Sequence, residues 1–233
     1  MCLLKVGSQM RIGTVLSGSL NPSALLEFPH KTGPADERMS PMTDSRTVPS
    51  LASSIATGAI GFAVVSFCVF ATVAYAERWM YRTLTELGAY LAWTVLFILF
   101  GGAVFGSLVV VRWRLPRFYL LFALAFFVYA AGWMIAYFTL HRTAGEVVGS
   151  VVGSVLMGLV FAIGFGALRS TVKLSVVLFV SNFLGYFLGA AILNSLRSPT
   201  GMLLFGVVYG LFFGAGIGAV LQMVQQVQRN EFA

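Results

Sequence analysis

Residues 202–222 read MLLFGVVYGLFFGAGIGAVLQ, a run of 21 residues without one charged side chain. In hydrocarbon no water is available to bond the backbone, so a chain crosses a bilayer as a helix that satisfies its own peptide groups. About 20 mostly apolar residues are enough to span the ~30 Å of hydrocarbon. This stretch therefore predicts a transmembrane helix.

The same pattern recurs along the chain. Apolar residues make up 58% of the 233 residues, charged residues 10%, and the mean hydropathy is +0.89, whereas a soluble domain carries about 25% charged residues. We predict an all-α fold, a polytopic membrane helical bundle with six transmembrane helices. They run from about Leu51 to Ala76, Leu87 to Val111, Phe118 to Leu140, Val147 to Leu168, Val172 to Leu193, and Met202 to Gln222.

The two ends of the chain differ from the region between them. Residues 1–50 mix Pro, Ser, Gly and charges without a helical or strand period, and we interpret them as a disordered tail. A sharper hypothesis is that translation starts at Met39 or Met42, so that part of this tail is not made. The six-helix domain is assigned to residues 51–223, and residues 224–233 to a short cytoplasmic tail. Val224 and Val227 keep helical spacing there; we favour a frayed helix end over a docking helix for a partner.

Helix-start signals lie in the breaks between the apolar segments. Thr83 with Glu86, and Thr143 with Glu146, have the spacing of capping boxes, in which both side chains satisfy free backbone N–H groups. Ser198 followed by Pro199 predicts an N-cap and a proline in the first turn of the last helix. Pro116 separates the second and third segments.

Basic residues predict the orientation, because Lys and Arg near the membrane stay on the cytoplasmic side. Eight lie on the side of the termini and four on the opposite side, which places both termini in the cytoplasm. The eight are Arg38, Arg46, Arg112, Arg114, Arg117, Arg169, Lys173 and Arg229, and the four are Arg78, Arg82, Arg142 and Arg197. We expect the membrane to be the bacterial plasma (inner) membrane. The basic residues flank apolar segments, so the net charge of +7 indicates contact with lipid headgroups and not with nucleic acid.

Glycine recurs every fourth residue in two of the predicted helices. Such glycines share one helix face and let a second helix approach closely. The interpretation we favour is packing within the bundle; the alternative is self-association or a pore lining. The positions are Gly206, Gly210, Gly214 and Gly218 in the last helix, and Gly145, Gly149 and Gly153 in the fourth.

A few polar side chains are expected inside the membrane. Asn182 lies near the middle of the fifth segment, and its amide needs partners, so it should face the bundle interior. Asn182, Ser181, Tyr129 and Thr94 are candidates for contact with a substrate. An interhelical hydrogen bond is the alternative that we favour.

The sequence also lacks the residues that several membrane chemistries require. Asp occurs only at Asp36 and Asp44, and His only at His30 and His141, which excludes intramembrane aspartate catalysis and a haem held by two histidines. We predict no catalytic residue, no cofactor and no metal.

One outer-side group of residues offers an alternative. Glu77, Glu86, His141 and Glu146 all fall in connections on the same predicted side, and together they could bind a metal or act as acid and base. We disfavour this alternative, because the capping boxes already use Glu86 and Glu146.

The absence of charge from mid-membrane positions disfavours a self-sufficient ion-coupled transporter. Small residues four apart in the first segment, Ala52 with Ala56 and Ala59 with Ala63, together with six short helices, resemble the substrate-binding subunits of energy-coupling-factor vitamin transporters. The resemblance is one of architecture, and it implies a membrane subunit that binds a substrate. We expect a small, uncharged or weakly polar solute and a partner or a second copy. We therefore rank first a non-enzymatic transport component, either a permease or a substrate-binding subunit. A structural or assembly subunit comes second, and a membrane enzyme that uses the outer-side group third.

Overall fold

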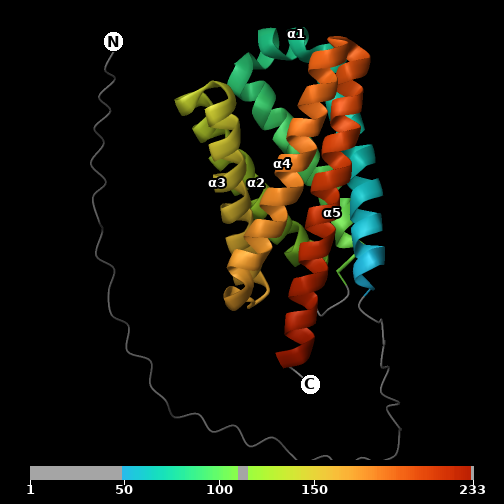
Figure 1. The fold of residues 1–233 in the computed structure, drawn as a ribbon, viewed down its shortest axis with the longest axis vertical. Helices are drawn as coiled ribbons and strands as arrows, with labels where there is room; N and C mark the ends of the chain where they lie inside the picture. Colours follow the sequence, from blue (N-terminus) through green and yellow to red (C-terminus); the bar gives the residue numbers. More distant parts are fainter. Residues whose placement is uncertain (1–48, 110–114, 232–233) are drawn as a thin grey trace, which may run out of the picture. The chain divides into compact units, whose positions relative to one another are not determined.

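The computed structural model describes residues 49–109 and 115–231. Residues 1–48 of the predicted tail, which is assigned to residues 1–50, and the alternative start sites lie outside this part. The described chain is helical, and it contains no strand (Figure 1). The predicted all-α helical bundle is confirmed. Its elements are α1 (Leu51–Gly106), α2 (Leu115–Leu140), α3 (Arg142–Gly164), the short 3-10 helix η1 (Leu168–Ser170), α4 (Thr171–Leu196) and α5 (Pro199–Glu231).

All five α-helices are long and apolar enough to cross a bilayer. Large apolar side chains are exposed along the outside of the bundle, among them Ile60, Leu120, Ile135 and Val172. In water such a surface would be strongly unfavourable, whereas in lipid it meets chains of its own polarity. The protein is therefore an integral membrane protein whose outer surface contacts the bilayer.

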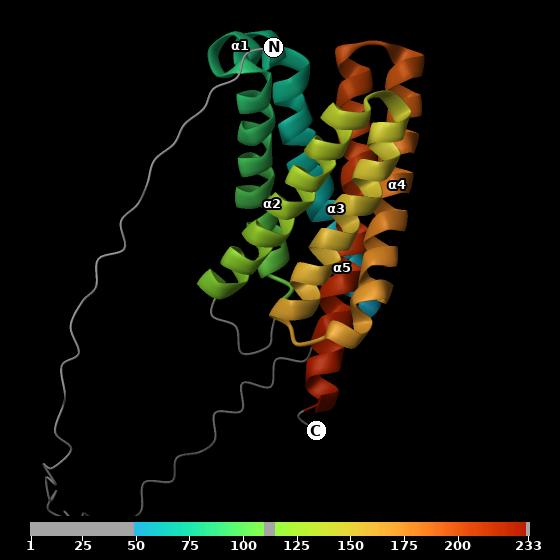
Figure 2. The same cartoon turned by 90° about the vertical axis from the view of Figure 1, so that its left-hand side faces the viewer.

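The count of helices differs by one from the expected six, because α1 of 56 residues contains the first two predicted segments, which a kink joins. A straight helix of that length would extend ~84 Å. Inside α1, however, Thr85 has a non-helical conformation with φ 65° and ψ 172°. The two halves run side by side in opposite directions (Figure 2), and Trp93 Nε1 donates a hydrogen bond of 3.0 Å to Thr72 Oγ1 between them.

The chain reverses direction at two opposite ends of the bundle. One end, called here the His141 end, holds Thr85, the link at His141 between α2 and α3, and the link at Arg197 between α4 and α5. The other end, called the Glu231 end, holds the start of α1 and the end of α5 (Figure 1). The first and last described residues therefore lie on the same side.

Two of the predicted helix starts are wrong in detail. Thr83 Oγ1 donates to the carbonyl of Trp79, and Thr85 Oγ1 is the acceptor for the N–H of Gly88. The cap of this helix segment is therefore Thr85, which has a positive φ and lies two residues later than expected. Thr143 lies inside α3, whose N-cap is His141 without a side-chain cap. The predicted start of α5 is confirmed, since Ser198 Oγ accepts from the N–H of Gly201 and Pro199 is the first helical residue.

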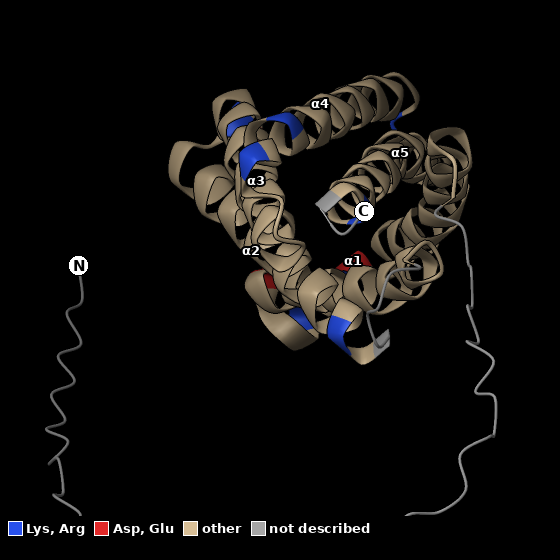
Figure 3. Ribbon diagram, turned by 90° about the horizontal axis from the view of Figure 1, so that it is seen from below, with Lys and Arg blue, Asp and Glu red and all other residues tan. Residues whose placement is uncertain are grey.

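Helix α5 lies between α1 and α4, as the view along the bundle shows (Figure 3). Its four regularly spaced glycines face the first half of α1, where a Cβ at each would collide with a neighbour. Gly206 meets Phe70, Gly210 meets Ala63, Gly214 meets the carbonyl of Gly58, and Gly218 meets the carbonyl of Ser54.

The glycines of α3 are used in the same way against α2. A Cβ at Gly145, Gly149 or Gly153 would collide with Tyr137, Trp133 or Tyr129, respectively. Both glycine faces are thus filled by helices of the same chain. This arrangement agrees with packing within the bundle, whereas self-association stays an untested alternative.

The end of α5 does not fray. Val224 and Gln225 are buried, and the helix continues to Glu231. Gln225 Nε2 donates to the carbonyl of Leu108 just beyond α1, and Gln228 Nε2 donates to the carbonyl of Phe165 just beyond α3. Carbonyls at helix ends lack intrahelical partners, so these glutamines join three helices at the Glu231 end.

Candidate functional site

Three polar side chains from three helices meet in the interior of the bundle. The hydroxyl of Tyr129 on α2 donates a 2.6 Å hydrogen bond to Oδ1 of Asn182 on α4. The hydroxyl of Tyr209 on α5 lies 3.3 Å from that of Tyr129. A phenol has one proton, so Tyr209 donates to Tyr129. We call these three residues the polar trio; Asn182 is fully buried, and the two tyrosines are 6% and 8% exposed.

The polar trio leaves donor capacity unused. Nδ2 of Asn182 has no hydrogen-bond partner, although it is buried. The hydroxyls of Ser66, Ser154 and Ser175 are also buried without a partner. A buried polar group without a partner costs about 1–3 kcal/mol, and native interiors contain few of them. Such a group needs an explanation, and a bound polar solute is one.

Aromatic side chains extend from the polar trio toward the His141 end. Tyr129, Trp133 and Tyr137 are four residues apart on α2, as are Asn182 and Tyr186 on α4, so each set lies on one helix face. Ring contacts join the helices: Trp133 lies 5.0 Å from Tyr137 and 6.0 Å from Tyr186 between ring centroids. Tyr186 lies 5.6 Å from Phe205, which stacks on Tyr209 at 6.1 Å. We call Trp133, Tyr137, Tyr186 and Phe205 the aromatic stripe.

A carboxylate lies beside this stripe at the His141 end. Glu146, in the first turns of α3, is partly buried and lies next to the hydroxyl of Tyr186. On the same face of α3 follow Ser150 and Ser154, both fully buried. Within residues 49–109 and 115–231, no Lys, Arg or His forms an ion pair with Glu146.

On its other side the polar trio meets a cluster of phenylalanines. Phe213 lies 5.0 Å from Tyr129 and 6.0 Å from Phe62, and Phe126 lies 5.8 Å from Tyr129 between ring centroids. Phe105, Phe118 and Phe122 continue this cluster toward the Glu231 end, and all three are buried. The polar and aromatic side chains thus lead to the trio from the His141 end, and apolar rings fill the interior beyond it.

The four candidate substrate contacts have different surroundings. Asn182 and Tyr129 meet, as described. Ser181 donates to the carbonyls of Val177 and Leu178 on its own helix, and Thr94 donates to that of Tyr90 on its own helix, so neither joins the trio. Sequence reasoning missed Tyr209. Its signal was available, because Tyr209 carries the single polar side chain in residues 202–221.

The outer-side group of Glu77, Glu86, His141 and Glu146 forms no set of ligands that could hold a metal in the described part of the chain. Glu77 lies beside Tyr81, and Glu146 beside Tyr186. The capping roles assigned to Glu86 and Glu146 are wrong, because Thr85 and His141 occupy the cap positions. A catalytic role of this group stays the disfavoured, untested alternative.

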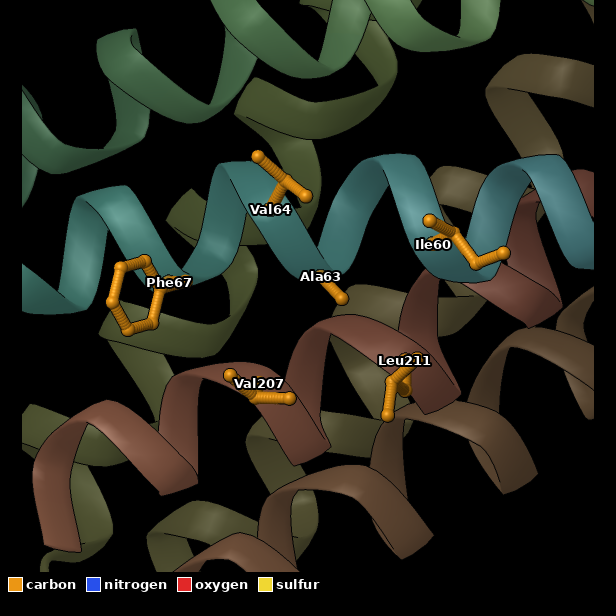
Figure 4. A pocket seen from close by; sticks show the side chains of 6 residues that line it. All are labelled: Ile60, Ala63, Val64, Phe67, Val207 and Leu211. Carbon is orange, nitrogen blue, oxygen red and sulfur yellow. The ribbon is translucent and has the colours of Figure 1, made fainter. Parts of the chain in front are cut away.

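A groove on the outer surface lies between α1 and α5, away from the polar trio. Ile60, Ala63, Val64, Phe67, Val207 and Leu211 line it (Figure 4). Its lining is apolar and it is open to the outside. The groove is therefore suited to contact with the acyl chains of the bilayer.

Comparison with protein-family models, with curated proteins and with solved structures gives no match for this chain. The interpretation of the site therefore depends on its own geometry.

Proposed function

We propose that this protein is a non-enzymatic transport component, a permease or a substrate-binding membrane subunit, that binds a small solute at the polar trio. The observation that carries the proposal is the unpaired Nδ2 of fully buried Asn182, next to two tyrosine hydroxyls. Polar groups inside a membrane are costly and commonly mark a substrate path. A solute with a hydrogen-bond acceptor would satisfy this donor.

The chemistry of the trio supports binding without reaction. Two phenols and one carboxamide supply hydrogen bonds and ring surface, whereas none of them is charged at neutral pH. Ion-coupled transporters commonly place an ionisable group at such a position. We therefore propose passive transport or transport driven by a partner, with the trio as the recognition element.

The proposed direction of access follows from the arrangement of side chains. Polar and aromatic groups approach the trio from the His141 end, and phenylalanines fill the opposite side. We propose that both termini are cytoplasmic in a bacterial inner membrane, as the distribution of Lys and Arg indicates. The His141 end then faces outward and receives the solute.

A second candidate function is a structural or assembly subunit of a membrane complex. The apolar groove between α1 and α5 favours it, because such a groove could receive a helix of another chain. The transport proposal ranks first because a scaffold does not require an unpaired amide in its interior.

The test is native mass spectrometry of the full chain purified in mild detergent. We expect a small molecule to remain bound to the natural sequence and to be lost in Asn182→Leu, which removes the amide and keeps a similar volume. Thr94→Val is the matched control, since Thr94 is buried and polar but bonds only within its own helix. Absence of a bound solute, or equal occupancy in Asn182→Leu, contradicts the proposal.

A further inference from the structure

The carboxylate of Glu146 lies in unusual surroundings. It is partly buried beside Tyr186. Tyr186 also contacts Trp133, and Trp133 stacks on Tyr137 with an angle of 10° between the rings. A carboxylate and three electron-rich rings are thus joined at the His141 end.

No basic group of the described chain neutralises this carboxylate. Arg142 precedes it by one helical turn, but Arg142 is exposed, has φ 51°, and makes no ion pair with it. An opposite charge close by stabilises the charged form of a buried or half-buried carboxyl group. The surroundings of Glu146 therefore suit a cation that comes from outside the chain.

The chemistry of that cation follows from the rings. An ammonium group over the face of a Trp or Tyr ring is attracted by the ring quadrupole, and a ring of aromatic side chains is the usual receptor for alkylated ammonium ions. A small metal ion would instead require several oxygen ligands; the described residues contain no such group.

Asn182 indicates which group the ligand carries at the end away from the cation. Asn182 and Tyr186 lie on the same face of α4, one turn or ~6 Å apart along the axis. Nδ2 of Asn182 is buried and unpaired, and the hydrogen bond from Tyr129 to Oδ1 places this amide on the face that meets α2. A ligand with an ammonium group near Glu146 can therefore present a hydrogen-bond acceptor to Asn182.

We infer that the solute is a small organic ammonium compound with a hydrogen-bond acceptor several bonds from its nitrogen. Glu146, Trp133, Tyr137 and Tyr186 receive the ammonium group, and Asn182 receives the acceptor. This inference rests on the proposed function and names the class of its solute.

The test uses two probes that differ in charge and hardly in shape. Acetylcholine carries a trimethylammonium group and an ester carbonyl, and 3,3-dimethylbutyl acetate replaces its nitrogen by carbon. We expect acetylcholine to bind the full chain in lipid nanodiscs at least tenfold more tightly, measured by isothermal titration calorimetry. Glu146→Gln should remove this preference and leave the affinity for 3,3-dimethylbutyl acetate unchanged.

Two further variants show whether a change in affinity comes from the proposed site or from a general effect on the protein. Glu77→Gln removes a carboxylate at the same end of the bundle, beside Tyr81, and should leave both affinities unchanged. Trp133→Leu should weaken the binding of acetylcholine and leave the binding of its neutral analogue unchanged. The unfolding temperature of this variant must stay close to that of the natural sequence.

The outcomes distinguish this inference from the proposed function. Equal binding of the two probes, an unchanged preference in Glu146→Gln, or binding of neither probe overturns the ammonium class. If a co-purified solute is nevertheless lost in Asn182→Leu, the transport proposal stands with another class of solute. If that solute is also insensitive to Asn182→Leu, both fail.

Discussion

Tyr129 and Asn182 lie 53 positions apart in the chain, and a 2.6 Å hydrogen bond joins them inside the bundle. Breaking this bond leaves the carboxamide without a partner at either end, because Nδ2 is already unpaired. We expect Tyr129→Phe to lower the free energy of unfolding by about 1–3 kcal/mol and to weaken solute binding. Thermal unfolding in detergent measures the first effect, and Tyr75→Phe, at an exposed position, is the control without loss.

A double-mutant cycle with Asn182→Leu shows whether the two side chains act together. With leucine at position 182, the change Tyr129→Phe should cost less than in the natural sequence, because only the hydroxyl of Tyr209 remains to lose a partner. Additive losses in the double variant would show that the bond contributes nothing.

Gly214 allows α5 to approach α1. A Cβ at this position would overlap the carbonyl of Gly58, and backbone cannot move aside as a side chain can. We expect Gly214→Ala to lower the free energy of unfolding by about 1–3 kcal/mol, the range found for overpacked interiors. Val176→Ala, on the exposed face of α4, should change it by roughly 0.5 kcal/mol or less. A Gly214→Ala protein as stable as the natural one would refute this close contact.

Thr85 carries strain at the turn inside α1. Its φ of 65° and ψ of 172° fall in a region that only glycine adopts readily, at a cost of about 1–3 kcal/mol for other residues. Thr85→Gly should therefore raise the unfolding temperature, since glycine also costs only a few tenths of a kcal/mol at an N-cap. Thr85→Val keeps the strain, loses the acceptor for Gly88, and should lower it. A lower unfolding temperature in Thr85→Gly than in the natural sequence would show that the cap outweighs the strain.

The end of α5 is expected to contribute to stability. A chain that stops after Met223 loses buried Val224 and the bond from Gln225 to the carbonyl of Leu108. We expect roughly 2–4 kcal/mol of destabilisation from lost burial and hydrogen bonding, measured by thermal unfolding. A chain that stops after Arg229 removes none of these contacts and should unfold at the original temperature. Equal stability of both shortened chains would restore the interpretation of a frayed end.

Orientation can be tested by cysteine labelling in intact cells. With Cys2 and Cys68 replaced by alanine, Arg142→Cys should react with a membrane-impermeant maleimide added outside, because this position lies exposed at the His141 end. Asn230→Cys at the Glu231 end should react after permeabilisation only. The opposite pattern would invert the topology and with it the direction of access to the polar trio.

The membrane character of the chain was readable from its sequence because hydrocarbon requires each crossing segment to satisfy its backbone locally. Residues 202–222 show this without any knowledge of neighbouring helices. The cap at Ser198 is local in the same sense, because it joins residues three apart. The joining of the first two segments was not readable, since one residue, Thr85, interrupts the helix and helical geometry resumes at once.

The site depends on contacts between distant segments. The position of Asn182 in its segment indicated a buried amide, but its partners lie on α2 and α5, at Tyr129 and Tyr209. Which side chains meet is decided by the rotation and the axial register of each helix. Close packing sets both, through contacts such as Gly214 with Gly58 and Gly153 with Tyr129. The amino-acid sequence by itself determined that the helices lie in a lipid bilayer and where most of them run in the chain. The tertiary structure alone decided which polar groups meet and which amide is left without a partner.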